Sequence, residues 1–168
     1  GVTTLDKTKF GDYADRFRAI LELSETTGVV PIMELWGHAA LNSLAEAVNI
    51  TIATGHPKAT LLLDFYHLYR GGNSWGTLDS LNFAKMPVFH INDYPGTIAR
   101  ELLKDGDRVF PGDGICPFNE LVPKLYNAGF RGGFSLELFN QGYWDTMDAK
   151  TLLKKGYDKT LLVLENSM

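Results

Sequence analysis

Four apolar segments of this chain each end at, or next to, a side chain that can bind a metal ion. These side chains are Glu34 in segment 29–35, Asp64 in 59–64, His90 in 86–92 and Glu137 in 132–139. Together they offer three carboxylates and one imidazole, a mixed oxygen and nitrogen set that suits Mn²⁺, Mg²⁺, Co²⁺ or Zn²⁺. The residue types alone do not select one of these ions.

Each of these residues, taken singly, has an ordinary structural explanation. An acid at the end of a strand is usually a solvated loop residue or a helix cap, and a single histidine such as His90 is more often a hydrogen-bonded core residue than a ligand. A metal-binding residue type at every strand end is much rarer by chance. The set as a whole therefore favours a metal centre.

Two residues near the strand ends fit contacts to these ligands or to a substrate. His67 lies three residues after Asp64, at the expected start of a loop, where it either reaches the same site or lies at the surface. Asp93, in the sequence HINDYPG, either orients His90 by accepting its second N–H or begins a turn with Pro95.

Three further residues fit the walls of a substrate pocket. Arg108 precedes the tight PGDG loop in the sequence RVFPGDG, and its guanidinium suits an anionic or polyhydroxyl substrate. Trp36 and His38 closely follow Glu34 and are expected to line the same pocket, although Trp36 also fits a packing role.

The elements that must position these residues alternate between strand and helix. Helices are expected over 8–27, 41–55, 118–129 and 146–166, with short helical pieces over 78–85 and 98–104, and the four apolar segments are the strands. The strands are nearly continuous in apolar character, which is typical of a parallel sheet buried on both faces. In parallel α/β folds, ligands bind at the carboxyl ends of the strands, so the four side chains are expected to meet.

Composition narrows the class of protein. The chain has 168 residues, of which 45% are hydrophobic and 21% charged, as in a globular domain. A net charge of −4 argues against binding of nucleic acid through phosphates, and no apolar run approaches the roughly 18 residues of a membrane span. The single cysteine, Cys116, excludes an intramolecular disulfide and favours a reducing compartment, so a cytoplasmic location is expected.

The motifs PIMELWG, LLLDFYHLYRGG, VFHINDYPG, RVFPGDG and FSLELF resemble the second half of a sugar phosphate isomerase/epimerase of the xylose isomerase-like TIM barrel superfamily. The resemblance runs from about residue 8 to the end of the chain. It implies one divalent metal ion, most often Mn²⁺, held by Glu34, Asp64, His90 and Glu137 at the ends of strands five to eight. It also implies that His67 and Arg108 contact a small sugar or cyclitol substrate.

Two stretches depart from that family. The ketose 3-epimerases carry a substrate-binding arginine shortly after the histidine ligand, whereas this chain has INDYPGT there. Many relatives have an acidic or polar residue in place of Cys116 or Pro117. Because of these two departures, the resemblance does not identify the substrate.

A (β/α)8 TIM barrel takes eight strands and about 250 residues, whereas four strands are counted here. We therefore expect residues 1–168 to form a single domain, the carboxyl half of a barrel. The other half would come from a longer polypeptide or from a second copy of the chain in a homo-oligomer.

The resemblance implies a metal-dependent isomerase or epimerase that moves a proton next to a carbonyl through an enediolate, with Glu34 and Glu137 as the proton carriers. A dehydratase or lyase of the inosose type on the same scaffold is one alternative, and a half-barrel module without catalysis is another. A DNA repair endonuclease of the same barrel class is disfavoured, because it would need more than the four histidines present and a basic face.

Overall fold

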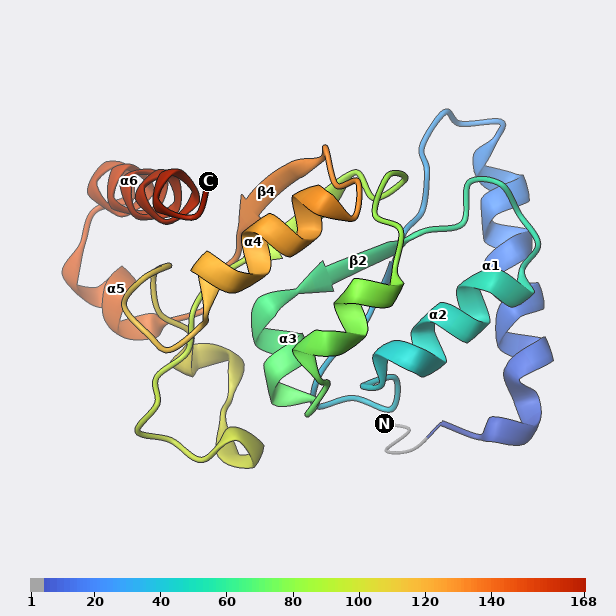
Figure 1. The fold of residues 1–168 in the computed structure, drawn as a ribbon, viewed down its shortest axis with the longest axis horizontal. Coiled ribbons are helices and arrows are strands. Elements are labelled where there is room, and N and C mark those ends of the chain that lie inside the picture. Colours follow the sequence, from blue (N-terminus) through green and yellow to red (C-terminus); the bar gives the residue numbers. More distant parts are fainter. Residues whose placement is uncertain (1–4) are drawn as a thin grey trace.

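The structure is a computed structural model that describes residues 5–168, so residues 1–4 of the expected domain lie outside the described part. Strand and helix alternate along the chain as predicted (Figure 1). The elements are η1 (Lys7–Lys9), α1 (Phe10–Ser24), β1 (Met33–Glu34), α2 (Leu44–Ala53), β2 (Leu61–Asp64), α3 (Phe65–Arg70), η2 (Trp75–Ser80), β3 (Val88–Ile91), η3 (Arg100–Leu102), η4 (Asp105–Asp107), α4 (Phe118–Asn127), β4 (Gly133–Leu136), α5 (Gln141–Thr146) and α6 (Ala149–Asn166).

The four strands form one parallel sheet in the order β1-β2-β3-β4. Each strand lies within one of the four predicted apolar segments and is shorter than that segment. In the register of the sheet, Glu34 pairs with Leu62, Asp64 with His90, and His90 with Ser135. The carboxyl ends of all four strands therefore lie at the same edge of the sheet, as the sequence pattern requires.

Helices cover one face of the sheet. Phe89 and Ile91 of β3 are fully buried, and so are Leu121 and Leu125 of α4, within one hydrophobic core. Each such side chain contributes about 1.5–3 kcal/mol by leaving water. The amphipathic pattern of residues 118–129 therefore places α4 against the sheet.

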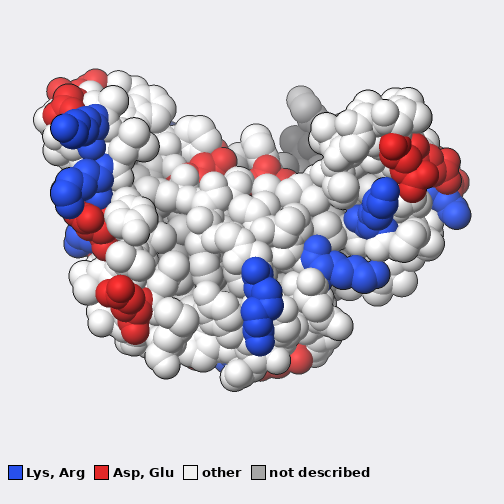
Figure 2. Space-filling view, turned by 90° about the horizontal axis from the view of Figure 1, so that it is seen from above, with Lys and Arg blue, Asp and Glu red and all other residues white. Residues whose placement is uncertain are grey.

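The opposite face of the sheet is open. Because side chains alternate along a strand, Val88 and His90 point away from the helices and are only half-buried, while Gly133 and Ser135 of β4 are exposed. Figure 1 shows α1 and α2 at one end of the sheet and α5 and α6 at the other. In Figure 2 these two ends rise on either side of a lower middle region, where acidic side chains are visible.

The structure corrects three predictions about local elements. Residues 65–70 form helix α3 instead of a loop, so His67 lies within a helix. The Asp64 carboxylate accepts the backbone N–H of His67 at 3.0 Å and so caps this helix directly after the strand. The short helix expected over 78–85 lies earlier, at η2, and the piece expected over 98–104 is confined to η3. Within the described residues, no helix combines the length and apolar character needed to cross a membrane.

Candidate metal centre

The four residues at the strand ends converge on one point. His90 lies at the centre, with its Nδ1 atom 3.3 Å from Glu34 Oε1, 3.3 Å from Glu137 Oε2 and 3.7 Å from Asp64 Oδ2. Glu34 and Asp64 are the last residues of β1 and β2, and Glu137 directly follows β4. The convergence predicted from the sequence is therefore present.

The spacing of these donor atoms fits a bound metal ion. Ligand atoms that lie about 2.1 Å from one ion are about 3.0–3.5 Å from one another, close to the distances around His90 Nδ1. Glu34 Oε1 and His90 Nδ1 are buried and have no hydrogen-bond partner among the described residues. Two buried lone-pair atoms that face one point without a partner are suited to bind a metal ion.

The electrostatics of the cluster favour a cation. The carboxylates of Glu137 and Glu34 favour the charged form of His90 and raise its pKa to about 10. His90, in turn, lowers the pKa of Glu137 to about 2. Burial raises the pKa of Glu34, but His90 and Trp36 outweigh this effect and keep it below its ordinary value. Oxygen and nitrogen donors in this charge environment suit a divalent ion.

Asp64 is the most enclosed member of the cluster, with no exposed surface. Its burial raises its pKa to about 6, although Arg108 opposes the shift. Its Oδ2 atom accepts hydrogen bonds from Asn92 Nδ2 at 2.8 Å and from Arg108 Nη1 at 3.2 Å. Asn92 also accepts the N–H of Tyr66, which ties the start of α3 to the end of β3.

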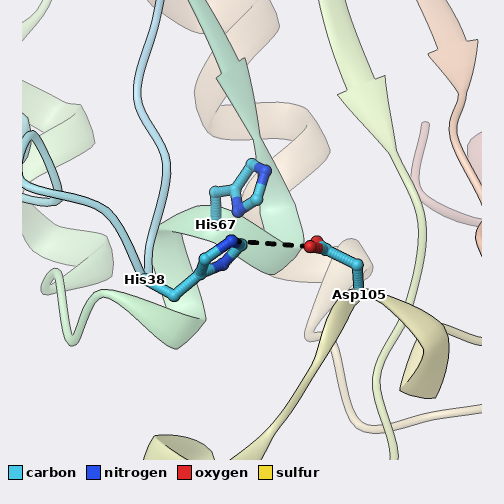
Figure 3. Close-up of side chains that lie close together, drawn as sticks. All are labelled: His38, His67 and Asp105. Carbon is cyan, nitrogen blue, oxygen red and sulfur yellow. Dashed lines mark ion pairs between the residues drawn. The ribbon is translucent and has the colours of Figure 1, made fainter. Parts of the chain in front are cut away.

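A second cluster of side chains adjoins the strand ends. His38, His67 and Asp105 lie close together, from the loop after β1, from α3 and from η4 (Figure 3). His38 Nε2 is 3.5 Å from Asp105 Oδ2. The ring of Trp36 stacks on that of His67 at 5.6 Å, and Trp36 Nε1 donates to Glu34 Oε2 at 2.6 Å. Trp36 therefore contacts the candidate ligand Glu34, and His38 lies beside Trp36 and His67.

His67 is buried within this cluster. Burial is the main reason that the pKa of His67 falls to about 4, with Arg108 adding to the effect. The imidazole is therefore neutral near pH 7. Its Nδ1 atom is 3.3 Å from the backbone nitrogen of Gly37, and its Nε2 atom is 3.1 Å from Arg108 Nη2.

Arg108 lies between the two clusters and is buried, with a 1% exposed side chain. It contacts Asp64 and Glu137 on one side and Asp105 and His67 on the other. It was predicted as a substrate contact, and its contacts in the structure are with protein side chains.

Asp93 has different partners from the predicted one. Its carboxylate accepts four backbone N–H groups, those of Tyr94, Gly112, Gly114 and Cys116, at 2.8–3.0 Å. Within residues 5–168, the structure gives it no hydrogen bond to His90. By accepting these N–H groups, Asp93 holds the PGDG loop against the end of the strand that carries His90.

Replacement of Asp93 is expected to destabilise the fold. Asp93→Ala leaves four N–H groups without their acceptor, and we expect the free energy of unfolding to fall by at least ~3 kcal/mol in urea titrations. Asp113→Ala is the matched control in the same loop. Its partly exposed ion pair with Lys159 is worth at most about 1 kcal/mol. Equal losses in the two variants would contradict this role of Asp93.

Gly37 fixes the loop that carries Trp36 and His38. A Cβ atom at Gly37 would be 2.7 Å from Gly71 N and 2.8 Å from Arg70 Cβ, and closer still to the carbonyl oxygen of His67. We expect Gly37→Ala to cost about 1–3 kcal/mol of unfolding free energy and to displace the loop. Gly11→Ala is the control, because a Cβ there meets nothing within 4 Å and the residue lies in α1. Unfolding of both variants by guanidinium measures the contrast, and a stable Gly37→Ala protein would contradict it.

Asp105 and Asn92 were not predicted from the sequence. Asn92 lies two residues after His90, and Asp105 three residues before Arg108. The second spacing brings the two side chains together across a single turn of η4. The spacing of Asp105 and Arg108, which suits an ion pair, was the only feature of the sequence that pointed to Asp105.

A parallel sheet with its polar side chains gathered at the carboxyl ends of the strands is the arrangement of a TIM-barrel protein. The chain belongs to the xylose isomerase-like TIM barrel family, whose sequence model matches residues 3–165. The resemblance found in the motifs is thereby confirmed.

The relatives and solved structures similar to this chain are longer than it is. A protein named inosose isomerase from Halalkalibacterium halodurans is 28% identical over 145 residues, which are 85% of this chain and 51% of that protein. A putative hydroxypyruvate isomerase from Streptomyces coelicolor is 30% identical over 95 residues, 56% of this chain and 30% of that protein. The crystal structure of IOLI protein with a bound zinc atom superposes with a TM-score of 0.89 at 23% identity, over 100% of this chain and 62% of that one. The chain spans about half the length of the first of these curated relatives.

Proposed function

We propose that this chain carries the metal centre of a sugar or cyclitol isomerase or epimerase. The observation that carries the proposal is the convergence of Glu34, Asp64 and Glu137 on His90 Nδ1 at 3.3–3.7 Å. The names of the curated relatives, inosose isomerase and hydroxypyruvate isomerase, support the same reaction class. Mn²⁺ is the first candidate for the ion, with Mg²⁺, Co²⁺ and Zn²⁺ as alternatives.

Glu34, Asp64, His90 and Glu137 would hold the ion. When bound, it supplies a Lewis acid that lowers the barrier to removing a proton beside a carbonyl. The chain's own residues would transfer the protons, position the substrate and exclude water.

Glu34 and Glu137 are the proposed proton carriers. One carboxylate would take the proton from the carbon beside the carbonyl, which leaves an enediolate, and the other, protonated from solvent, would return a proton. Return to the former carbonyl carbon, with transfer of the hydroxyl proton to the other oxygen, gives the isomer, and return to the opposite face of the same carbon gives the epimer. Trp36 Nε1 holds Glu34 Oε2 at 2.6 Å and Arg108 Nη1 holds Glu137 Oε2 at 2.6 Å, so both carboxylates are oriented before the substrate arrives.

His38 is proposed to contact substrate hydroxyl groups, with the exposed ring of Trp36 as a wall. His67, which the sequence suggested as a substrate contact, is buried, and its Nδ1 and Nε2 atoms face Gly37 N and Arg108 Nη2. We propose that its neutral ring, stacked on Trp36, positions the residues of this wall.

We also propose that the four strands are strands five to eight of a barrel and that the domain is its carboxyl half. The open sheet face at Val88, His90, Gly133 and Ser135 would then face the barrel interior. Four further βα units, from a longer polypeptide or from a second copy, would cover it. The intact mass of the native protein and its mass in solution distinguish these two sources. A cytoplasmic location remains a prediction.

A substrate panel tests the proposed activity. The purified native protein, loaded with Mn²⁺, is incubated with ketoses, hydroxypyruvate and inososes, and the products are identified by NMR. Isomer or epimer formation that stops with a chelator supports the proposal. Loss of water from an inosose would favour the dehydratase instead, and metal binding without turnover of any substrate would favour a module without catalysis.

A further inference from the structure

Arg108 occupies a position that joins the candidate metal centre to the cluster of His38, His67 and Asp105. We propose that Arg108 is a positioning residue that fixes the metal-binding carboxylates and ties them to this cluster, and that it makes no contact with the substrate. The inference rests on the metal centre of the proposed function. It replaces the substrate contact that the sequence suggested for Arg108.

The hydrogen-bonding capacity of Arg108 is already used within the protein. A guanidinium has five N–H donors. Nη1 donates to Glu137 Oε2 at 2.6 Å and to Asp64 Oδ2 at 3.2 Å, while Nη2 donates to Asp105 Oδ1 at 2.6 Å and lies 3.1 Å from His67 Nε2. Three of the five donors are therefore accepted by carboxylates, and the fourth faces the ring of His67. The fifth, on Nε, is buried with no partner among the described residues, so no donor is left facing a pocket.

One side of the guanidinium acts on the metal ligands directly. Glu137 Oε2 and Asp64 Oδ2, which accept from Nη1, are the same oxygen atoms that face His90 Nδ1 at 3.3 and 3.7 Å. Arg108 therefore fixes the orientation of two of the three carboxylates. Its positive charge lies against two of the three ligand carboxylates, which matters because buried charges must be balanced.

The other side of the guanidinium reaches the second cluster. Asp105 accepts from Arg108 through Oδ1, while its Oδ2 lies 3.5 Å from His38 Nε2 (Figure 3). Asp105 thus links Arg108 to His38, and Arg108 itself touches His67. A shift of Arg108 would move both histidines together with the carboxylates, so the two halves of the site are held in one fixed geometry.

The surroundings of Arg108 require an arginine. The guanidinium carbon lies 4.4 Å from the centre of the Tyr66 ring and 5.1 Å from that of Phe139, so the planar group packs against two aromatic rings. A lysine would keep the charge, but its single ammonium cannot reach four acceptors on two sides at once. Charge and geometry can therefore be separated by experiment.

The test compares Arg108→Met and Arg108→Lys with wild type and with Arg18→Met, a control in which an exposed pair with Glu22 is lost. Calorimetric titration of the metal-free native protein with Mn²⁺ measures the dissociation constant, and KM and kcat are measured at saturating Mn²⁺ with the substrate found in the panel. We expect both Arg108 variants to bind Mn²⁺ about 10–100-fold more weakly. At saturating Mn²⁺, kcat should fall, because the carboxylates lose their fixed orientation.

Two results would overturn the inference. One is Mn²⁺ affinity within about threefold of wild type together with a raised KM, the pattern of a substrate contact. The other is wild-type behaviour of Arg108→Lys, which would mean that charge alone is needed. If Arg108→Met does not fold, as circular dichroism would show, the Arg108→Lys protein decides. Failure of the proposed function is distinguishable, because wild type itself would then bind no Mn²⁺ or turn over no substrate.

Discussion

Glu137→Gln is expected to abolish measurable turnover and to weaken metal binding. The substitution keeps the shape of the side chain but removes a negative charge that lies 3.3 Å from His90 Nδ1 and 2.6 Å from Arg108 Nη1. Loss of a proton carrier alone lowers kcat by about 10²–10⁴-fold, and loss of the charge weakens Mn²⁺ binding at least ~10-fold. Steady-state kinetics and metal titration on the same preparation measure both effects.

Glu120→Gln serves as the control for this variant. Glu120 lies on the exposed side of α4, where it pairs with Lys124 at 3.5 Å, so its loss leaves the metal centre untouched. A Glu137→Gln protein with unchanged metal content and full activity would refute the assignment of Glu137.

Glu34→Gln is expected to separate the two proton transfers. The glutamine oxygen can still accept from Trp36 Nε1, which bonds Glu34 Oε2 at 2.6 Å, so the loop after β1 should keep its position. We expect conversion of the substrate to fall by about 100-fold or more, because one of the two carriers is lost. Glu137 remains, so exchange of the carbon-bound proton with solvent deuterium should persist at a rate at least ~10-fold above conversion.

The exchange is followed by NMR in D₂O with the substrate identified in the panel. Glu25→Gln, an exposed residue near His56, is the control. Equal losses of exchange and conversion would show that Glu34 and Glu137 do not divide the two transfers between them.

The strand ends could be predicted because their information is local. Each apolar run stops at a residue that can bind a metal, and a parallel sheet brings the carboxyl ends of its strands to one edge. Asp64 and His90, which are 26 positions apart in sequence, are thus direct neighbours in the register of β2 and β3. The family resemblance and the pattern led to the same four residues.

The residues around the ligands were harder to predict. Helix α3 was missed because its side chains from Phe65 to Leu68 are all buried, so the segment has no amphipathic period. Asp93 was expected either to orient His90 or to begin a turn with Pro95, because both are close in sequence, but its oxygens bind the backbone of a loop some twenty residues away. The role of Asp105 depends on how the 3-10 turns after β3 fold back. The spacing of apolar residues in the sequence does not predict that path.

The contacts of Arg108 could not be predicted from the sequence either. Its type and its position before the PGDG loop marked it as a functional residue. Whether its donors face a substrate or other side chains depends on the places of Asp64, Glu137 and Asp105 in space, and these come from separate elements.

The metal centre is tested most directly by calorimetric titration of the metal-free native protein with Mn²⁺, alongside the variants His90→Ala and His56→Ala. The account predicts one ion per chain in wild type and in His56→Ala, whose histidine lies beside Glu25 outside the site, and binding at least ~100-fold weaker in His90→Ala. Absence of binding by wild type, or wild-type affinity in His90→Ala, would contradict it.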